Sequence, residues 1–182
     1  MTRIPLPASI EDAPAAARPL LEAVKAQLGS VPNLFRITAN SPAALGGYLE
    51  LNGALAKGEL PAGTRERIAL AVAQKNGCDY CLSAHSYIGK NMAKLDDAEI
   101  AANRRGRSTD PKADAAVRFA TALVETRGSV PETEIDAVKF AGYSDAQIVE
   151  IVAHVALNTL TNYLNEALGT PIDFPVVTKD AA

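Results

Sequence analysis

Aromatic residues and long apolar runs are scarce in this sequence. Tryptophan is absent, and aromatic residues fill only 5% of the 182 positions. A composition rich in alanine and poor in aromatics favours closely packed helices over a sheet. No stretch reaches the about 18 uninterrupted apolar residues that a membrane span needs, and the first residues lack the apolar run of a signal peptide. We therefore expect a globular protein with no membrane association.

Basic charge and cysteine are also in short supply. The formal net charge of −3 offers no basic face to a polynucleotide, so we expect no nucleic-acid partner. The only cysteines are Cys78 and Cys81, whereas a secreted scaffold uses more of them, at distant positions, to crosslink its loops. Two neighbouring thiols indicate redox or metal chemistry in a reducing compartment, which predicts a cytoplasmic protein. No haem, flavin or nicotinamide motif occurs, and we expect no cofactor.

What the sequence does contain is helical punctuation. Ser41 followed by Pro42 is typical of a helix start, and Ser144 with Gln147 forms a capping box before a long final helix. Residues 68–73 are apolar on every side, which predicts a central, buried helix that ends at Asn76-Gly77. The pattern predicts an all-α fold, a compact bundle of about seven to nine helices. We expect a polar loop over residues 103–109 and an extended tail that covers a neighbour.

The segment with the clearest chemical content begins directly after the buried helix. Cys78 and Cys81 form a Cys-x-x-Cys motif at the predicted start of a helix that runs to about Met92, so both sulfurs lie on one turn. The free N–H groups at a helix start stabilise a thiolate and lower the thiol pKa. Attack on a peroxide or a disulfide requires that thiolate.

His85 and Glu66 are the candidates for proton transfer. His85 lies four residues after Cys81 on the same helical face, and Glu66 lies twelve residues before Cys78 on the preceding helix. If the two helices cross as an antiparallel pair, the carboxylate can orient the imidazole and complete a relay. Taken singly, each residue also has a purely structural explanation: the cysteines as packed apolar residues, His85 as an ordinary histidine and Glu66 as a first-turn acid. The functional hypothesis depends on their joint spacing.

The pattern Glu-x11-Cys-x2-Cys-x3-His resembles the signature of AhpD-like alkylhydroperoxidases in the carboxymuconolactone decarboxylase superfamily, and specifically its peroxidase-related branch. The similarity extends from about residue 31 to 166 and includes the strings at 31–35, 41–42, 76–78 and 161–165. It implies a single AhpD-like domain over residues 1–182, with the core at about 31–166 and a tail at 167–182. It also implies a homo-oligomer, a trimer or hexamer.

For the chemistry, the resemblance implies a thiol-dependent alkyl hydroperoxide reductase. Cys81 would attack the peroxide, Cys78 would resolve the sulfenic acid, and His85 and Glu66 would relay protons through an ordered water. The reductant would be an external dithiol on a lipoyl-carrying or thioredoxin-like protein. From the residues alone the order stays open, because the helix start favours Cys78 as the thiolate and the step to His85 favours Cys81.

Tyr80 departs from the family pattern, which has a second histidine between the cysteines. Tyrosine is a poor base at neutral pH, so we expect weaker peroxidase activity or a different substrate. The cysteine pair disfavours lactone decarboxylation, since the decarboxylase branch generally lacks it. The alternatives are a redox-sensing or disulfide-exchange protein with the same cysteine pair, or a zinc site made by Cys78, Cys81, His85 and Glu66.

Three polar residues of the final helix have less specific interpretations. We expect His154 to be a core histidine with its hydrogen bonds satisfied, because it lies on an apolar helix. Asn158 and Asn162 are four residues apart and either hydrogen-bond near the cysteines or serve a contact between helices.

Overall fold

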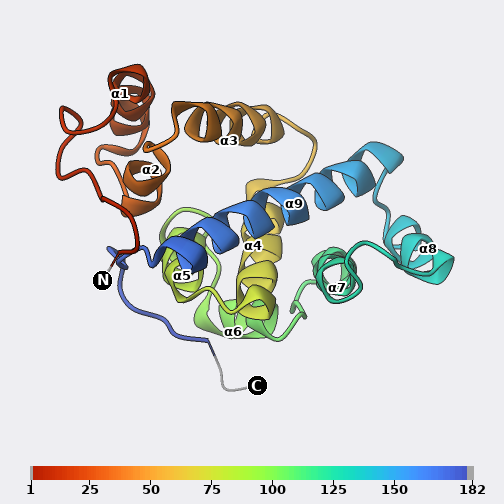
Figure 1. The fold of residues 1–182 in the computed structure, drawn as a ribbon. Coiled ribbons are helices and arrows are strands. Elements are labelled where there is room, and N and C mark those ends of the chain that lie inside the picture. Colours follow the sequence, from red (N-terminus) through yellow and green to blue (C-terminus); the bar gives the residue numbers. More distant parts are fainter. Residues whose placement is uncertain (1, 180–182) are drawn as a thin grey trace.

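A computed structural model of the chain describes residues 2–179, and in this range it contains nine α-helices, one short 3-10 helix and no strand (Figure 1). The prediction of an all-α bundle of seven to nine helices is therefore confirmed. The elements are η1 (Ala15–Ala17), α1 (Arg18–Leu28), α2 (Asn33–Thr38), α3 (Pro42–Leu55), α4 (Ala62–Asn76), α5 (Asp79–Asn91), α6 (Asp97–Arg104), α7 (Pro111–Glu125), α8 (Glu132–Phe140) and α9 (Asp145–Leu168). None of the helices within residues 2–179 has the length and apolar character needed to span a lipid bilayer.

Helix α4 forms the centre of the molecule. It packs against α5, α6, α7 and α9, and Figure 1 shows α9 crossing it. Residues 68–73 are all buried, as predicted for a helix that is apolar on every side. Because α4 has neighbours on several sides, its position is determined by packing, and the residues that it carries are held rigidly.

The predicted helix starts agree with the structure. The Ser41 hydroxyl accepts a hydrogen bond from the backbone N–H of Ala44, and the Ser144–Gln147 capping box is complete. At the end of α4, Gly77 adopts a left-handed conformation with φ of 68°, which is nearly free of strain for glycine. This turn connects α4 directly to Cys78 at the start of α5.

Two of the apolar clusters each join several helices. The larger one lies between α4, α7, α8 and α9, and Phe119 is among its largest fully buried side chains. A second cluster joins η1, α1, α2 and α3 through Ala17, Leu21 and Leu45. The helices before α4 therefore form a separate packed layer, which Figure 1 shows to one side of α4 and α5.

The C-terminal tail lies along α5. Helix α9 continues to Leu168, so the tail starts two residues later than the predicted residue 167. Residues 180–182 of the predicted tail lie outside the described part of the chain. The Phe174 ring packs edge-on against Tyr80, and the Val177 backbone N–H donates to the Ser83 hydroxyl at 2.9 Å. In this chain the tail therefore covers α5.

The predicted loop over residues 103–109 is partly wrong. Helix α6 continues to Arg104, and Asn103 is fully buried. The reason is Glu99, whose carboxylate accepts hydrogen bonds from Asn103, Ser108 and Thr109. These bonds draw the polar segment onto α6 instead of leaving it in solvent.

Candidate active site

The cysteine motif begins α5. Cys78 is the N-cap residue with an extended backbone, and its Sγ accepts a hydrogen bond from the backbone N–H of Cys81 at 3.3 Å. Both thiols are free and almost completely buried. The motif thus lies at the helix start, as expected, with both sulfurs shielded among α4, α5, α9 and the tail.

The pKa values of the two thiols are shifted in opposite directions. A hydrogen bond between the two thiol side chains is the main cause that lowers the pKa of Cys81 to about 7, and the charge of His85 adds to it against the opposing effect of burial. The same hydrogen bond, together with burial, raises the pKa of Cys78 well above its usual range. Cys81 is therefore the thiol that ionises first, near neutral pH, while Cys78 keeps its proton. The sequence alone had left this order open.

Glu66 and His85 meet across the α4–α5 contact. The Glu66 Oε2 atom lies 2.8 Å from His85 Nδ1, and both side chains are about four-fifths buried, with exposures of 19% and 21%. Burial lowers the pKa of His85, but the charge and hydrogen bond of Glu66 and the charge of Cys81 outweigh it and raise the pKa overall. Because Glu66 occupies Nδ1, the other ring nitrogen is the one that can exchange a proton. The structure thus brings all four predicted residues together.

Helix α9 supplies a contact that the sequence reasoning missed. Asn165 Nδ2 donates a hydrogen bond to Cys81 Sγ at 3.2 Å, and Asn165 is only 2% exposed. Asn162 also lowers the pKa of Cys81, and its Oδ1 accepts from Asn76 Nδ2 at 2.9 Å. Asn158 has no such role, since its amide donates to the carbonyl of His154. The available signal was the spacing of 158, 162 and 165 on one face of an apolar helix.

Tyr80 serves packing. Its hydroxyl accepts a hydrogen bond from the backbone N–H of Leu34 at 3.0 Å, and its ring contacts Phe174 at 5.8 Å between centroids. Burial raises its pKa above the usual range, so the phenol stays neutral. The residue that replaces the family's second histidine thus links α2, α5 and the tail.

The prediction for His154 is half right. The residue is buried in the core, but its Nε2 atom has no hydrogen-bond partner within residues 2–179. The imidazole is therefore not satisfied as expected. Burial lowers its pKa, which keeps it neutral near pH 7.

The zinc alternative finds no support in the side-chain geometry. Within residues 2–179, no three histidine, cysteine, aspartate or glutamate side chains are arranged so that they could hold a metal ion. The Glu66–His85 hydrogen bond already occupies one nitrogen and one oxygen of the proposed ligand set.

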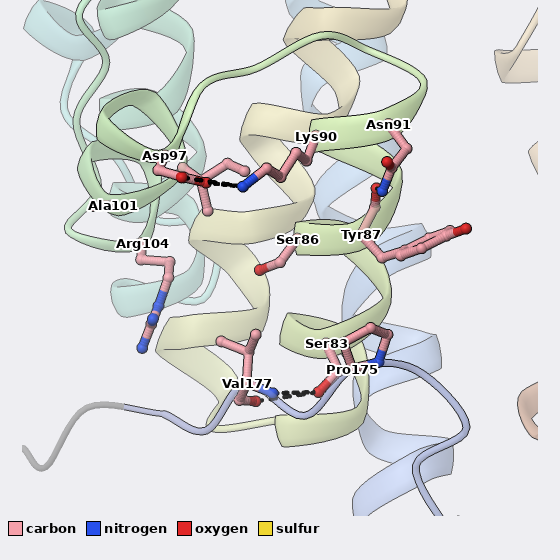
Figure 2. Close-up of a pocket in the computed structure, with 11 residues that line it drawn as sticks. Ser83, Ser86, Tyr87, Lys90, Asn91, Asp97, Ala101, Arg104, Pro175 and Val177 are labelled. Carbon is pink, nitrogen blue, oxygen red and sulfur yellow. Dashed lines mark hydrogen bonds and ion pairs between the residues drawn. The ribbon is translucent and has the colours of Figure 1, made fainter.

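A pocket of about 490 Å³ lies elsewhere on α5, between that helix, α6 and the tail (Figure 2). Ser83, Ser86 and Lys90 line it from α5, and the Lys90–Asp97 ion pair lies at its edge. None of the four predicted site residues contributes to its wall. The pocket is therefore separate from the sulfur centre.

Residues 42–125 match the model of the carboxymuconolactone decarboxylase family, and this segment contains all four predicted site residues. No curated protein matches the sequence significantly.

Three solved structures share the fold over nearly the whole chain. A peroxidase-related protein with an alkylhydroperoxidase AhpD core from Ralstonia eutropha JMP134 superposes with a TM-score of 0.84 at 25% identity, covering 94% of this chain and 92% of that one. A peroxidase-related protein from Silicibacter sp. TM1040 gives 0.80 at 23% identity, with 93% and 91% covered. The debrominase Bmp8, in a complex with 2,3,4-tribromopyrrole, gives 0.77 at 22% identity, with 95% and 94% covered. Residues 42–125 therefore resemble the carboxymuconolactone decarboxylase family, and the fold of the chain is that of the AhpD-like, peroxidase-related structures.

Proposed function

We propose that this protein is an enzyme, a thiol-dependent hydroperoxide reductase that uses Cys81 as nucleophile and Cys78 as resolving thiol. The observation that carries the proposal is the environment of Cys81: a buried sulfur with a pKa of about 7, held between a second thiol and an amide. A nucleophilic thiolate at neutral pH beside a protonated partner is what a two-cysteine peroxidase needs.

In the first step the Cys81 thiolate attacks the terminal oxygen of the hydroperoxide. The S–O bond forms as the O–O bond breaks, which gives a sulfenic acid on Cys81 and an alkoxide. The alkoxide takes a proton from the His85 imidazolium and leaves as the alcohol. Glu66 supports this step because its carboxylate holds the imidazole in place and favours its protonated form.

In the second step the Cys78 sulfur attacks the sulfenic sulfur of Cys81, which releases water and forms a disulfide. The raised pKa of Cys78 keeps this thiol protonated until the sulfenic acid exists, so it does not compete for the substrate. The two thiols have then supplied two electrons to the peroxide. An external dithiol, on a lipoyl-carrying or thioredoxin-like protein, restores them by thiol–disulfide exchange.

The absence of the family's second histidine leaves His85 as the proton donor. Tyr80 does not substitute for it, since its hydroxyl is bound to the Leu34 N–H and its pKa is raised. We therefore expect turnover to depend on His85 more steeply than in a relative with two histidines.

The test is a hydroperoxide consumption assay with cumene and tert-butyl hydroperoxide, with lipoyl and thioredoxin donors compared. Cys81→Ser should abolish consumption, whereas Cys78→Ser should consume one equivalent and retain a sulfenic acid that a dimedone probe labels. Thermal unfolding of both variants controls for folding. Equal, negligible consumption by the wild type and both variants would contradict the enzyme, and peroxide-driven disulfide formation without turnover would indicate a redox sensor.

The structural likeness to Bmp8 supports a second candidate, the reductive removal of bromine from an aromatic ring. The electron balance is the same, because the carbon–bromine bond becomes carbon–hydrogen while the two thiols become a disulfide and hydrogen bromide leaves. Adding 2,3,4-tribromopyrrole to the same assay separates the candidates. Bromide release that exceeds hydroperoxide consumption would favour the debrominase.

A further inference from the structure

Asn165 occupies a position where both its backbone and its side chain are held. It lies in the last turn of α9, and its carbonyl accepts the capping N–H of Gly169 and the N–H of Thr170. Gly169 has φ of 64°, so the chain turns away directly after the helix. The side chain is buried against Cys81, 84 residues away in sequence, with Nδ2 at 3.2 Å from the sulfur.

The carbonyl oxygen of the same side-chain amide makes no hydrogen bond to the described residues. Asn165 Oδ1 is buried and has no hydrogen-bond partner within residues 2–179. A buried carbonyl oxygen without a donor is unfavourable, so an unpaired one in a native site indicates a missing donor. Both ends of this amide belong to one planar group, so the unpaired Oδ1 lies on the same side chain that contacts the Cys81 sulfur.

We propose that Asn165 is a further catalytic residue, whose Nδ2 holds the Cys81 thiolate while its Oδ1 accepts a hydrogen bond from the O–H group of the hydroperoxide. The inference rests on the proposed function and names the group that selects the substrate. A thiolate only accepts hydrogen bonds, so it orients the amide with nitrogen toward sulfur and oxygen toward the substrate. The terminal peroxide oxygen is then held next to the sulfur that attacks it, and the sulfenic O–H that forms donates to the same Oδ1.

A neutral amide suits this position. A carboxylate would raise the pKa of Cys81, and a lysine or arginine would pair with the thiolate so strongly that it weakened the nucleophile. The ionisable groups that act on the two sulfurs or are acted on by them are Cys78, Tyr80 and His85 from α5, Tyr48 from α3 and Glu166 from α9, and Glu66 from α4 acts on His85. Asn165 adds a directed hydrogen bond from α9 that none of these groups duplicates.

The first measurement is the pH dependence of alkylation by iodoacetamide, which reads the Cys81 thiolate without any peroxide. Labelling is kept below one equivalent, and fragment mass spectrometry identifies the modified sulfur. Asn165→Leu and Asn165→Asp should each raise the midpoint by about one pH unit or more, because both lose the donor to a charged sulfur. Asn158→Leu is the matched control, a buried asparagine of the same helix whose amide does not contact Cys81, and its midpoint should match the wild type.

The second measurement is single-turnover reduction of cumene hydroperoxide at a pH above all midpoints, where every variant is fully ionised. Asn165→Leu should be slower by about fivefold or more, since it lacks the acceptor, while Asn165→Asp retains an acceptor oxygen but loses the donor to the sulfur and should lie between Asn165→Leu and the wild type. The limiting alkylation rate should not fall in either Asn165 variant, because a thiolate of higher pKa is a stronger nucleophile.

The outcomes separate three claims: the contact of Nδ2 with the thiolate, the contact of Oδ1 with the substrate, and the proposed function itself. Unchanged alkylation midpoints in both Asn165 variants would overturn the contact with the thiolate. Equal single-turnover rates for Asn165→Leu and the wild type would overturn the contact with the substrate. If the wild type itself fails to reduce the hydroperoxide, the proposed function fails, and the alkylation result still decides the role of Nδ2.

Discussion

At the scale of single residues, the charge on Glu66 affects the pKa of His85 directly and that of Cys81 indirectly. It sets the protonation of His85, and through His85 it influences Cys81. A carboxylate on one helix thereby affects a sulfur on the next without touching it. This indirect effect of Glu66 on Cys81 through His85 is the basis of the proton relay that the spacing of the residues suggested.

Replacing Glu66 with glutamine should lower the pKa of His85 and slow hydroperoxide reduction near pH 7 by about tenfold. The amide keeps the shape but removes the negative charge, so burial then determines the imidazole pKa and favours the neutral form. The chain has two histidines, so the ring-proton NMR titration of His85 can be followed against that of His154.

The control for this change is Glu132→Gln, which removes an exposed carboxylate from the first turn of α8. It should leave both titrations and the rate unchanged. An unaltered His85 titration in Glu66→Gln would contradict the coupling.

At the scale of elements, Glu99 joins α6 to its surroundings. It is only 4% exposed and accepts hydrogen bonds from Arg67 on α4 and from Asn103, Ser108 and Thr109. Burial acts to raise its pKa, but these hydrogen bonds prevail and lower it from 4.5 to about 2.

Glu99→Gln should lower the free energy of unfolding at pH 7 by about 2–4 kcal/mol, because it leaves a buried network without its acceptor charge. A depressed folded-state pKa stabilises the fold above the unfolded value near 4.5, and the contribution is lost as the pH falls toward about 2. Urea unfolding should therefore show a large difference between variant and wild type at pH 7 and a smaller one at pH 3.

The matched control is Asp97→Asn, in the same helix. Asp97 is 80% exposed in its ion pair with Lys90, so its loss should change stability by no more than about 0.5 kcal/mol. A difference for Glu99→Gln that stays constant from pH 7 to pH 3 would contradict the assignment.

The tail gives a second prediction at this scale. Phe174 contacts the rings of Tyr80 and Tyr87 on α5, with centroids at 5.8 and 6.0 Å. Phe174→Ala should cost about 1–3 kcal/mol and increase amide hydrogen exchange over residues 170–179 and the start of α5. Phe140→Ala is the control, because Phe140 is 95% exposed and its removal should leave exchange unchanged. Equal exchange in the two variants would show that the tail is held by its polar contacts alone.

At the scale of the whole molecule, one face of α9 exposes apolar side chains. Val149, Val152, Leu160 and Tyr163 are between 43% and 67% exposed, and Ala156 lies between them on the same face. The steps of three and four residues make a stripe that can pair with itself in a second copy of the helix. The family resemblance predicts a homo-oligomer, and this face is where we expect the copies to meet.

Leu160→Glu should therefore reduce the native mass measured by light scattering after size-exclusion chromatography. Burying a carboxylate in such an interface costs more than the contact provides. Met92→Glu is the control, because Met92 is 67% exposed but lies at the end of α5, away from the stripe. A wild type that is monomeric at micromolar concentration would contradict the expectation.

The sequence by itself determined the helical fold and pointed to the cysteine pair with His85 and Glu66 as candidate site residues. Caps at Ser41 and Ser144, the buried run at 68–73 and the turn at Gly77 are local signals, readable because helix ends and amphipathic faces have a short period. The Glu66–His85 contact was predicted on the condition that the two adjacent helices cross as an antiparallel pair, and the structure contains this contact.

Only the tertiary structure decided which sulfur carries the charge and what holds it. The pKa difference between Cys78 and Cys81 depends on hydrogen-bond direction, burial and the nearby imidazole, none of which a spacing encodes. Asn165 approaches Cys81 from 84 residues away, and Glu99 gathers a segment that reads as a solvated loop. Such contacts depend on how helices cross, and a crossing is determined by the packing of the whole core.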